Sequence, residues 1–110
     1  MDLKATSDLL RGHTDTIVLS ILLKCDSYGY EIHKTILEKT NDQFELKEAT
    51  LYSSYKRLEK NGYISSYWGD ETQGGRRKYY TITETGKELY RQSKRDWEKT
   101  KYILNQLLEE

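Results

Sequence analysis

The sequence contains no proline, only one cysteine and no apolar run long enough to span a membrane. Cys25 cannot form a disulfide within the chain, and nothing near it resembles an activated thiol, so we expect a small, partly buried side chain without a catalytic role. No signal-peptide pattern is present either. We therefore expect a soluble, cytoplasmic protein that makes no contact with a membrane.

The residue clusters of an enzyme or a metal site are also missing. His13 and His33 have no carboxylate or thiol cluster at ligand spacing, so we predict no metal and no cofactor, and expect surface or boundary histidines. The Asp, Glu, His and Cys residues form no recognisable acid–base or nucleophilic constellation, which argues against an enzyme. Gly74-Gly75 could belong to a phosphate-binding loop. Because no Gly-Lys-Ser or Gly-Lys-Thr follows, a tight turn is the better interpretation.

The chain has no excess of either charge, since 18 basic residues balance 18 acidic ones. A neutral chain binds polyanions poorly without specificity, so the distribution of charge is more informative than its total. Residues 47–78 contain seven lysines and arginines against four acidic residues, a net charge of plus three. These cations could form an ordinary solvated face, but their presence on two neighbouring elements favours a nucleic-acid surface.

Hydrophobic residues are scarce as well, at 35% against 33% charged residues. A single domain of 110 residues with so lean a core favours an oligomer, because association buries further apolar surface. The ten tyrosines suit half-buried faces and interfaces better than a deep core.

What is present is organised around residues 47–82, which combine an amphipathic helix with a β-ribbon. Between Ala49 and Lys60, the residues Leu51, Tyr55 and Leu58 recur at steps of four and three, which predicts one buried helical face. The opposite face has small or hydroxyl residues first and cations last, a pattern that suits a groove. Its residues are Ala49, Thr50, Ser53, Lys56, Arg57 and Lys60.

Two β-prone runs follow this helix, Tyr63–Trp68 and Arg77–Ile82. A turn centred near Gln73 predicts aromatic and apolar cross-strand pairs that can stabilise a small hairpin. The predicted pairs are Tyr67 with Tyr79, Ser66 with Tyr80, Trp68 with Lys78, and Ile64 with Ile82.

Two further helices are predicted before this unit. Thr14 can cap a first helix that runs to about Lys24, and its apolar block favours a buried helix over a strand. Ser27 can cap a second helix that ends near Thr40. Two helices followed, after a short polar connection, by a third form the helix-turn-helix arrangement, whose last helix enters the major groove of DNA.

The chain closes with a long predicted helix, capped by Thr83 and running from Glu84 to Leu108. One seam of this helix has steps of three and four residues, the spacing of a face that packs on another helix. Its residues are Tyr90, Ser93, Trp97, Thr100, Leu104 and Leu107, supported by Leu89, Ile103 and Leu108. The seam could pack on its own domain alone, but so long a helix extends past the three-helix core, which favours a homodimer.

Six short motifs cover nearly the whole chain: Leu10-Arg11-Gly12, Tyr28-Gly29-Tyr30-Glu31-Ile32, Ala49-Thr50-Leu51-Tyr52, Lys56-Arg57-Leu58-Glu59, Gly62-Tyr63-Ile64 and Gly74-Gly75-Arg76-Arg77-Lys78-Tyr79-Tyr80. Together they resemble the signature of the PadR family of bacterial transcriptional regulators. Residues 65–71 and the single C-terminal helix resemble in particular its small members, which are related to the lactococcal multidrug-sensing repressor.

The resemblance implies a winged-helix homodimer that binds double-stranded DNA, usually at an inverted-repeat operator, and is released by a small molecule or a stress signal. Carried over by motif, the contacts to DNA are Thr50, Tyr52, Lys56 and Arg57 from the recognition helix and Arg76, Arg77 and Lys78 from the wing. The exposed face of the helix adds Ser53 and Lys60 to this set. Many members open the recognition helix with a capping serine and a proline. Here Lys47 and Glu48 replace them, so we expect a helix without a side-chain cap.

Trp97 lies in the apolar seam, between residues that leave space around an indole. In a two-fold dimer, the two indoles could face one another and hold a planar aromatic ligand between them. The small relatives bind aromatic drugs in a pore of this kind, and Trp97 is at the position of their tryptophan. The alternative is that Trp97 only fills the interface, together with Tyr90, Leu104, Leu107 and Leu108.

The sequence therefore predicts a mainly α fold with a small β-hairpin. Residues 1–83 would form a winged helix-turn-helix domain and residues 84–110 a dimerisation helix. The predicted function is that of a sequence-specific, multidrug-responsive repressor, released by a small inducer. The alternative is a winged helix that binds only other proteins, which would show no salt-dependent binding to DNA.

Overall fold

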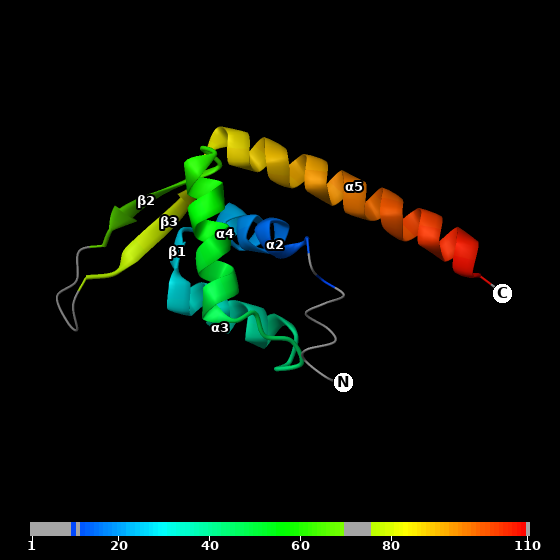
Figure 1. Ribbon diagram of the computed structural model, residues 1–110, viewed down its shortest axis with the longest axis horizontal. Helices are drawn as coiled ribbons and strands as arrows, with labels where there is room; N and C mark the ends of the chain where they lie inside the picture. Colours follow the sequence, from blue (N-terminus) through cyan, green and yellow to red (C-terminus); the bar gives the residue numbers. More distant parts are fainter. Residues whose placement is uncertain (1–9, 11, 70–75, 110) are drawn as a thin grey trace.

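The computed structural model describes residues 10, 12–69 and 76–109 (Figure 1). The elements in chain order are α2 (Thr14–Lys24), β1 (Ser27–Tyr28), α3 (Gly29–Lys39), α4 (Glu48–Lys60), β2 (Ile64–Trp68), β3 (Lys78–Ile82) and α5 (Glu84–Leu108). Figure 1 shows α2, α3 and α4 clustered together, with the sheet on one side of them. Helix α5 runs past α2 and then away from the rest of the molecule. This is the predicted winged helix-turn-helix with a long C-terminal helix.

One apolar core holds the helices together. Leu19 of α2, Ile32 of α3 and Leu58 of α4 are at most 1% exposed. The predicted buried face of α4 is confirmed, because Leu51 and Tyr55 lie in the same core as Leu58. Burying an aliphatic side chain of this size stabilises a fold by about 1.5–3 kcal/mol, so this face fixes α4 on the other helices.

The connection between α3 and α4 is the polar turn that the sequence predicts. Asn41 and Asp42 have positive φ angles of 53° and 63°, a region that these two residue types tolerate better than other side chains. Thr40 Oγ1 accepts a hydrogen bond from the amide of Phe44 at 3.2 Å, and Phe44 is buried. The turn is therefore anchored at both of its ends before α4 begins.

The wing has the predicted register. Strands β2 and β3 are antiparallel, with Ile64 opposite Ile82, Ser66 opposite Tyr80, Tyr67 opposite Tyr79 and Trp68 opposite Lys78. The predicted turn at Gln73 and the pair Gly74-Gly75 lie outside the described residues. Alternation of side chains between the two faces explains the agreement, because a slip of one residue would bring Ile64 out of the core.

The hairpin belongs to a larger sheet than predicted, because β1 pairs with the other side of β3. The prediction that Ser27 caps the second helix is therefore wrong. Its buried side chain donates to Glu31 Oε1 at 2.6 Å, and α3 begins at Gly29 after Tyr28. A strand of two residues has no recognisable periodicity, so only pairing with β3 defines it.

Two smaller predictions are also wrong. The N-cap of α2 is His13, which makes no side-chain cap hydrogen bond, and Thr14 is the first residue of the helix. Cys25 is exposed rather than partly buried, because it follows the last residue of α2 as the chain turns towards β1. The cap of α5 is confirmed, since Thr83 Oγ1 accepts from the amide of Gly86 at 3.1 Å.

Candidate nucleic-acid interface

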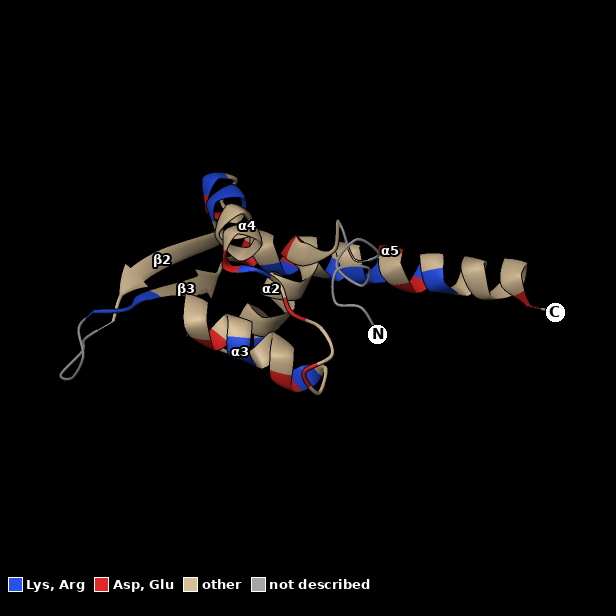
Figure 2. Ribbon diagram, turned by 60° about the horizontal axis from the view of Figure 1, so that its bottom comes forward, with Lys and Arg blue, Asp and Glu red and all other residues tan. Residues whose placement is uncertain are grey.

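Helix α4 exposes the face that the sequence predicts for DNA. The exposed residues include Thr50, Tyr52, Ser53, Lys56, Arg57 and Lys60. Figure 2 shows basic residues at one end of α4 and along the segment that enters β3. Lys56 Nζ lies 5.5 Å from the centre of the Tyr52 ring, so these two side chains are neighbours on this face. The face thus presents hydroxyl, aromatic and cationic groups, which can bind base edges and phosphates.

The start of α4 has no side-chain cap, as expected. Lys47 is its N-cap residue and makes no side-chain cap hydrogen bond. Glu48 lies in the first turn, where a negative charge interacts favourably with the helix dipole.

Arg57 is half-exposed, but its guanidinium is bound within the protein. Its Nε donates to Asp15 Oδ2 at 2.9 Å, and its Nη2 donates to Asp15 Oδ1. Ser54, which is fully buried, donates to the same carboxylate at 2.7 Å. Burial raises the pKa of Asp15, but hydrogen bonds from Arg57 and Ser54 outweigh this effect and hold its pKa below the usual range. Asp15 and Arg57 therefore form a charged pair between α2 and α4 at neutral pH.

The cations of the wing lie on two different faces. Side chains alternate along a strand, and Arg76 and Lys78 lie on the face that packs against α4. Arg76 Cζ is 5.0 Å from the centre of the Trp68 ring. Lys78 Nζ is 3.9 Å from Glu59 Oε1 of α4. The Lys78–Glu59 contact joins the wing to α4, whereas the Arg76–Trp68 contact lies within the wing itself.

Arg77 lies on the other face of the wing, together with a group of tyrosines. Its Cζ is 4.8 Å from the centre of the Tyr28 ring. The Tyr79 ring makes an edge contact with Tyr28 and stacks on Tyr67, at 5.3 and 5.6 Å between centres. The Tyr67 hydroxyl donates to Asp26 Oδ2 at 2.6 Å, which raises the pKa of this tyrosine. The tyrosines thus hold β1 to the wing and position Arg77 beside β1.

The seam of α5 becomes exposed along its length. Tyr90 is half-buried against the core, whereas Trp97 is 45% exposed. Beyond it, Leu104 is 46%, Leu107 73% and Leu108 75% exposed. These apolar side chains have no cover from the other described residues.

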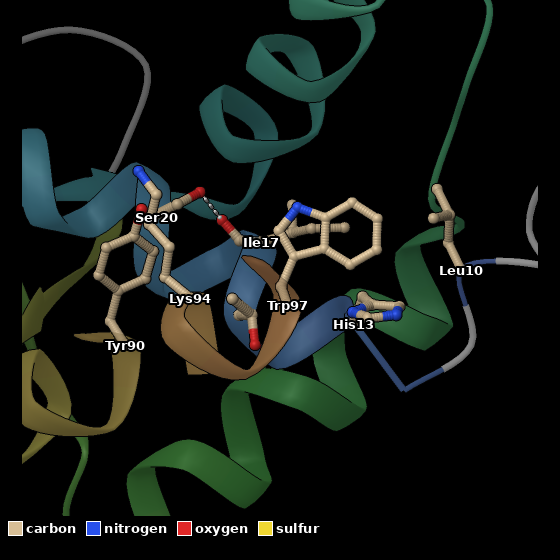
Figure 3. A pocket seen from close by; sticks show the side chains of 8 residues that line it. Leu10, His13, Ile17, Ser20, Tyr90, Lys94 and Trp97 are labelled. Atoms are coloured by element: carbon tan, nitrogen blue, oxygen red, sulfur yellow. Dashed lines mark hydrogen bonds between the residues drawn. The ribbon is translucent and has the colours of Figure 1, made fainter. Parts of the chain in front are cut away.

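A cleft of about 250 Å³ lies between α2 and α5 (Figure 3). Figure 3 shows Tyr90, Lys94 and Trp97 of α5 facing side chains at the α2 side of the cleft. The described residues that line it are Leu10, His13, Thr16, Ile17, Ser20, Tyr90, Lys94 and Trp97. The Trp97 and His13 rings meet edge to face with centres 5.8 Å apart. The indole therefore forms one wall of a mostly apolar cleft within a single chain.

Sequence reasoning missed two parts of this arrangement. The α2 side of the cleft was not foreseen, although His13, Ile17 and Ser20 have helical spacing. Asp15 and Ser54 were also missed. Ser54 falls within the apolar stripe of α4 and is thus placed for burial, and a buried hydroxyl requires a partner. That signal could have indicated a polar contact, but not its partner 39 residues away.

Among the described residues, no group of three or more His, Cys, Asp and Glu side chains could hold a metal ion. His33 instead lies 2.9 Å from Glu45 Oε2. No helix in the described part of the chain is long and apolar enough to cross a membrane.

Comparison with known proteins gives a consistent result. A family model described as the transcriptional regulator PadR-like family matches residues 18–92. The chain is 46% identical over 103 residues to an uncharacterized protein of Lysinibacillus sphaericus, and the match covers 94% of each sequence.

Solved structures resemble this one over most of the chain. A transcriptional regulator from Clostridium thermocellum is 52% identical, with a TM-score of 0.86 over 94% of this chain and 97% of that one. A PadR family transcription regulator from Clostridium difficile is 42% identical, with a TM-score of 0.78 over 87% of this chain and 98% of that one.

Proposed function

The chain belongs to the PadR-like family of transcriptional regulators, which are DNA-binding proteins and not enzymes, and we propose that it acts as a homodimeric repressor at an inverted-repeat operator. The observation that carries this proposal is the exposure of hydroxyl and cationic side chains on α4, together with exposed cations on the wing. Such a protein represses by occupying DNA that polymerase would use.

In this proposal, α4 reads the major groove. Thr50 and Ser53 are short enough to approach base edges, and Lys56 can donate to guanine acceptors. Tyr52 and Lys60 lie on the same exposed face and contact DNA beside them. Arg57 lies there too, but Asp15 binds its Nε and Nη2, so it reaches DNA only through its remaining Nη1. Cations of the wing, Arg76, Arg77 and Lys78, bind phosphates and fix the orientation of the protein on the duplex.

Replacing Arg76 or Arg77 with alanine should weaken binding to all duplexes about equally. Each loss of a phosphate contact should lower the salt slope by about 0.9 and the affinity about fivefold near 0.15 M salt. The measurement is titration of a fluorescent duplex at several salt concentrations. Arg91→Ala is the matched control, because it removes the same charge from an exposed position on α5. An altered base preference with an unchanged salt slope would contradict a phosphate contact.

The second copy is proposed to bind along α5, from Tyr90 through Trp97 to Leu104, Leu107 and Leu108. The exposed fractions of the last three residues support this, since they lie beyond the reach of the chain's own core. A two-fold axis between two such helices would hold the recognition helices about 34–36 Å apart, the distance between successive major grooves on one side of DNA.

The inducer is proposed to be a planar aromatic molecule that binds against Trp97. The cleft between α2 and α5 supports this, because its walls are mainly apolar and one of them is an indole. A ligand there releases DNA only if it favours a dimer whose recognition helices have the wrong spacing.

A planar fluorescent dye should quench the emission of Trp97 with saturation. The titration uses Trp68→Phe, which leaves Trp97 as the only tryptophan. Trp97→Ala should lower the affinity for the dye about tenfold, because it removes the stacking surface. Since this variant lacks the Trp97 signal, its affinity is measured from the emission of the dye itself. Trp68→Phe serves as the control and should bind like the wild type. Equal affinity after Trp97→Ala would leave this residue as packing only.

A further inference from the structure

Helix α2 packs on both α4 and α5, and Asp15 is its polar link to α4. The carboxylate of Asp15 accepts hydrogen bonds from Ser54 on the buried face of α4 and from Arg57 on its exposed side. Ser54 and Arg57, which are three residues apart on α4, thus bind the same carboxylate. Rotation of α4 about its own axis would therefore break one bond or the other.

The rotation of α4 decides which side chains face the bases. Ser53 is the neighbour of Ser54, about 100° around the helix, so the bond to Ser54 also sets the direction of Ser53. Packing of Leu51 and Leu58 on the core limits the tilt of α4, but apolar contacts are non-directional and resist a small rotation weakly. A hydrogen bond within a buried network is directional and resists it more strongly.

The same carboxylate also balances the charge of Arg57. Arg57 is 52% exposed on the DNA-facing side of α4, so an unpaired guanidinium there would attract any phosphate. Paired with Asp15, it adds little net charge to the surface. Lys56 and Lys60 remain as the cations of that end of α4.

We propose that Asp15 is a specificity-determining positioning residue for DNA, which holds α4 at the rotation that reads bases and neutralises Arg57 against indiscriminate phosphate binding. The inference rests on DNA reading by α4, as proposed above. Asp15 acts through Ser54 and Arg57 and does not itself touch DNA.

The test compares two duplexes: one selected by the wild-type protein from a randomised library, and one with the same composition in shuffled order. Asp15→Asn should tighten binding to the shuffled duplex about fivefold near 0.15 M salt and raise the salt slope by about 0.9, because Arg57 becomes free for phosphate. The preference, which is the ratio of the affinity for the selected duplex to that for the shuffled duplex, should fall about tenfold. A variant that was merely less stable would bind both duplexes more weakly.

Ser54→Ala separates the two roles of the carboxylate. It removes the buried hydrogen bond without changing the charge, so affinity for the shuffled duplex should stay constant while the preference falls. Glu88→Gln removes an exposed acidic group of α5 and should change neither quantity. Urea unfolding of each variant verifies that the folded state is populated.

Three results would overturn the proposal. The first is an unchanged preference in both Asp15→Asn and Ser54→Ala. The second is an equal loss of affinity for the selected and the shuffled duplex. The third is tighter binding to the shuffled duplex with no loss of preference. If the wild type itself showed no preference for any selected duplex, the DNA-reading function of α4 would fail as well. A wild-type preference that survives both Asp15→Asn and Ser54→Ala overturns only the role of Asp15.

Discussion

Replacing Gly86 with alanine should lower the free energy of unfolding by about 3 kcal/mol, because the first turn of α5 lies directly on the backbone that precedes β2. A Cβ at this position would be 2.0 Å from the carbonyl oxygen of Tyr63 and 2.8 Å from Ile82 Cγ1. The higher helix propensity of alanine offsets only about 1 kcal/mol of the overpacking cost. The backbone must therefore shift, or the first turn of α5 must move away from Tyr63.

The neighbouring hydrogen bonds prevent an easy shift. The Tyr63 carbonyl accepts from the amide of Thr83 at 3.1 Å. The Gly62 carbonyl accepts from the hydroxyls of Thr83 and Thr85 at 2.7 and 3.0 Å. A displacement that made room for a methyl group would break bonds that hold α5 to the start of the wing.

Urea or thermal unfolding measures this effect, and Gly29→Ala is the matched control. Like Gly86, Gly29 lies in the first turn of a helix, since it is the first residue of α3. A Cβ at Gly29 would meet only the Tyr55 ring at 3.8 Å, which is an ordinary contact. Gly29→Ala should therefore unfold near the wild-type midpoint, while Gly86→Ala unfolds well below it. Equal midpoints for the two variants would show that the contact between α5 and Tyr63 can relax without loss of stability.

The double substitution Leu104→Glu with Leu107→Glu should make the protein monomeric and lower its affinity for an inverted repeat by about two orders of magnitude. Four carboxylates would face one another across the proposed two-fold interface and lose solvation there. A monomer contacts one half-site only and loses the high effective concentration of the second recognition helix. Because both leucines are exposed in the single chain, its own stability should change little.

Sedimentation equilibrium and titration of a duplex with two half-sites measure the two effects. The control is Asn105→Glu with Gln106→Glu, which adds the same charge to the same turns of α5 but on another side of the helix. The control should remain dimeric and bind DNA with only a modest loss from the added negative charge. A dimer that survives the leucine substitutions, or a monomer that binds as tightly as the wild type, would rule out α5 as the dimer contact.

The sequence by itself determined the elements whose signals are local. Helix α4 follows from Leu51, Tyr55 and Leu58, and the start of α5 from the cap at Thr83. The register of β2 and β3 follows from alternation over five residues in each strand. Each of these signals depends on side chains within about one or two turns, or on the pleat of a strand, so no distant part of the chain is needed to interpret it.

Only the tertiary structure decided which side chains meet across elements. Asp15 reaches Ser54 and Arg57 because α2 packs on α4, although about 40 residues of chain separate them. The two residues of β1 become a strand only beside β3. The constraint at Gly86 likewise exists only because α5 sits on the Tyr63 carbonyl. Helical period and capping determine which face of an element is buried and where the element ends. The angle at which two packed elements cross determines which side chains meet, and no local stretch of the sequence contains that angle.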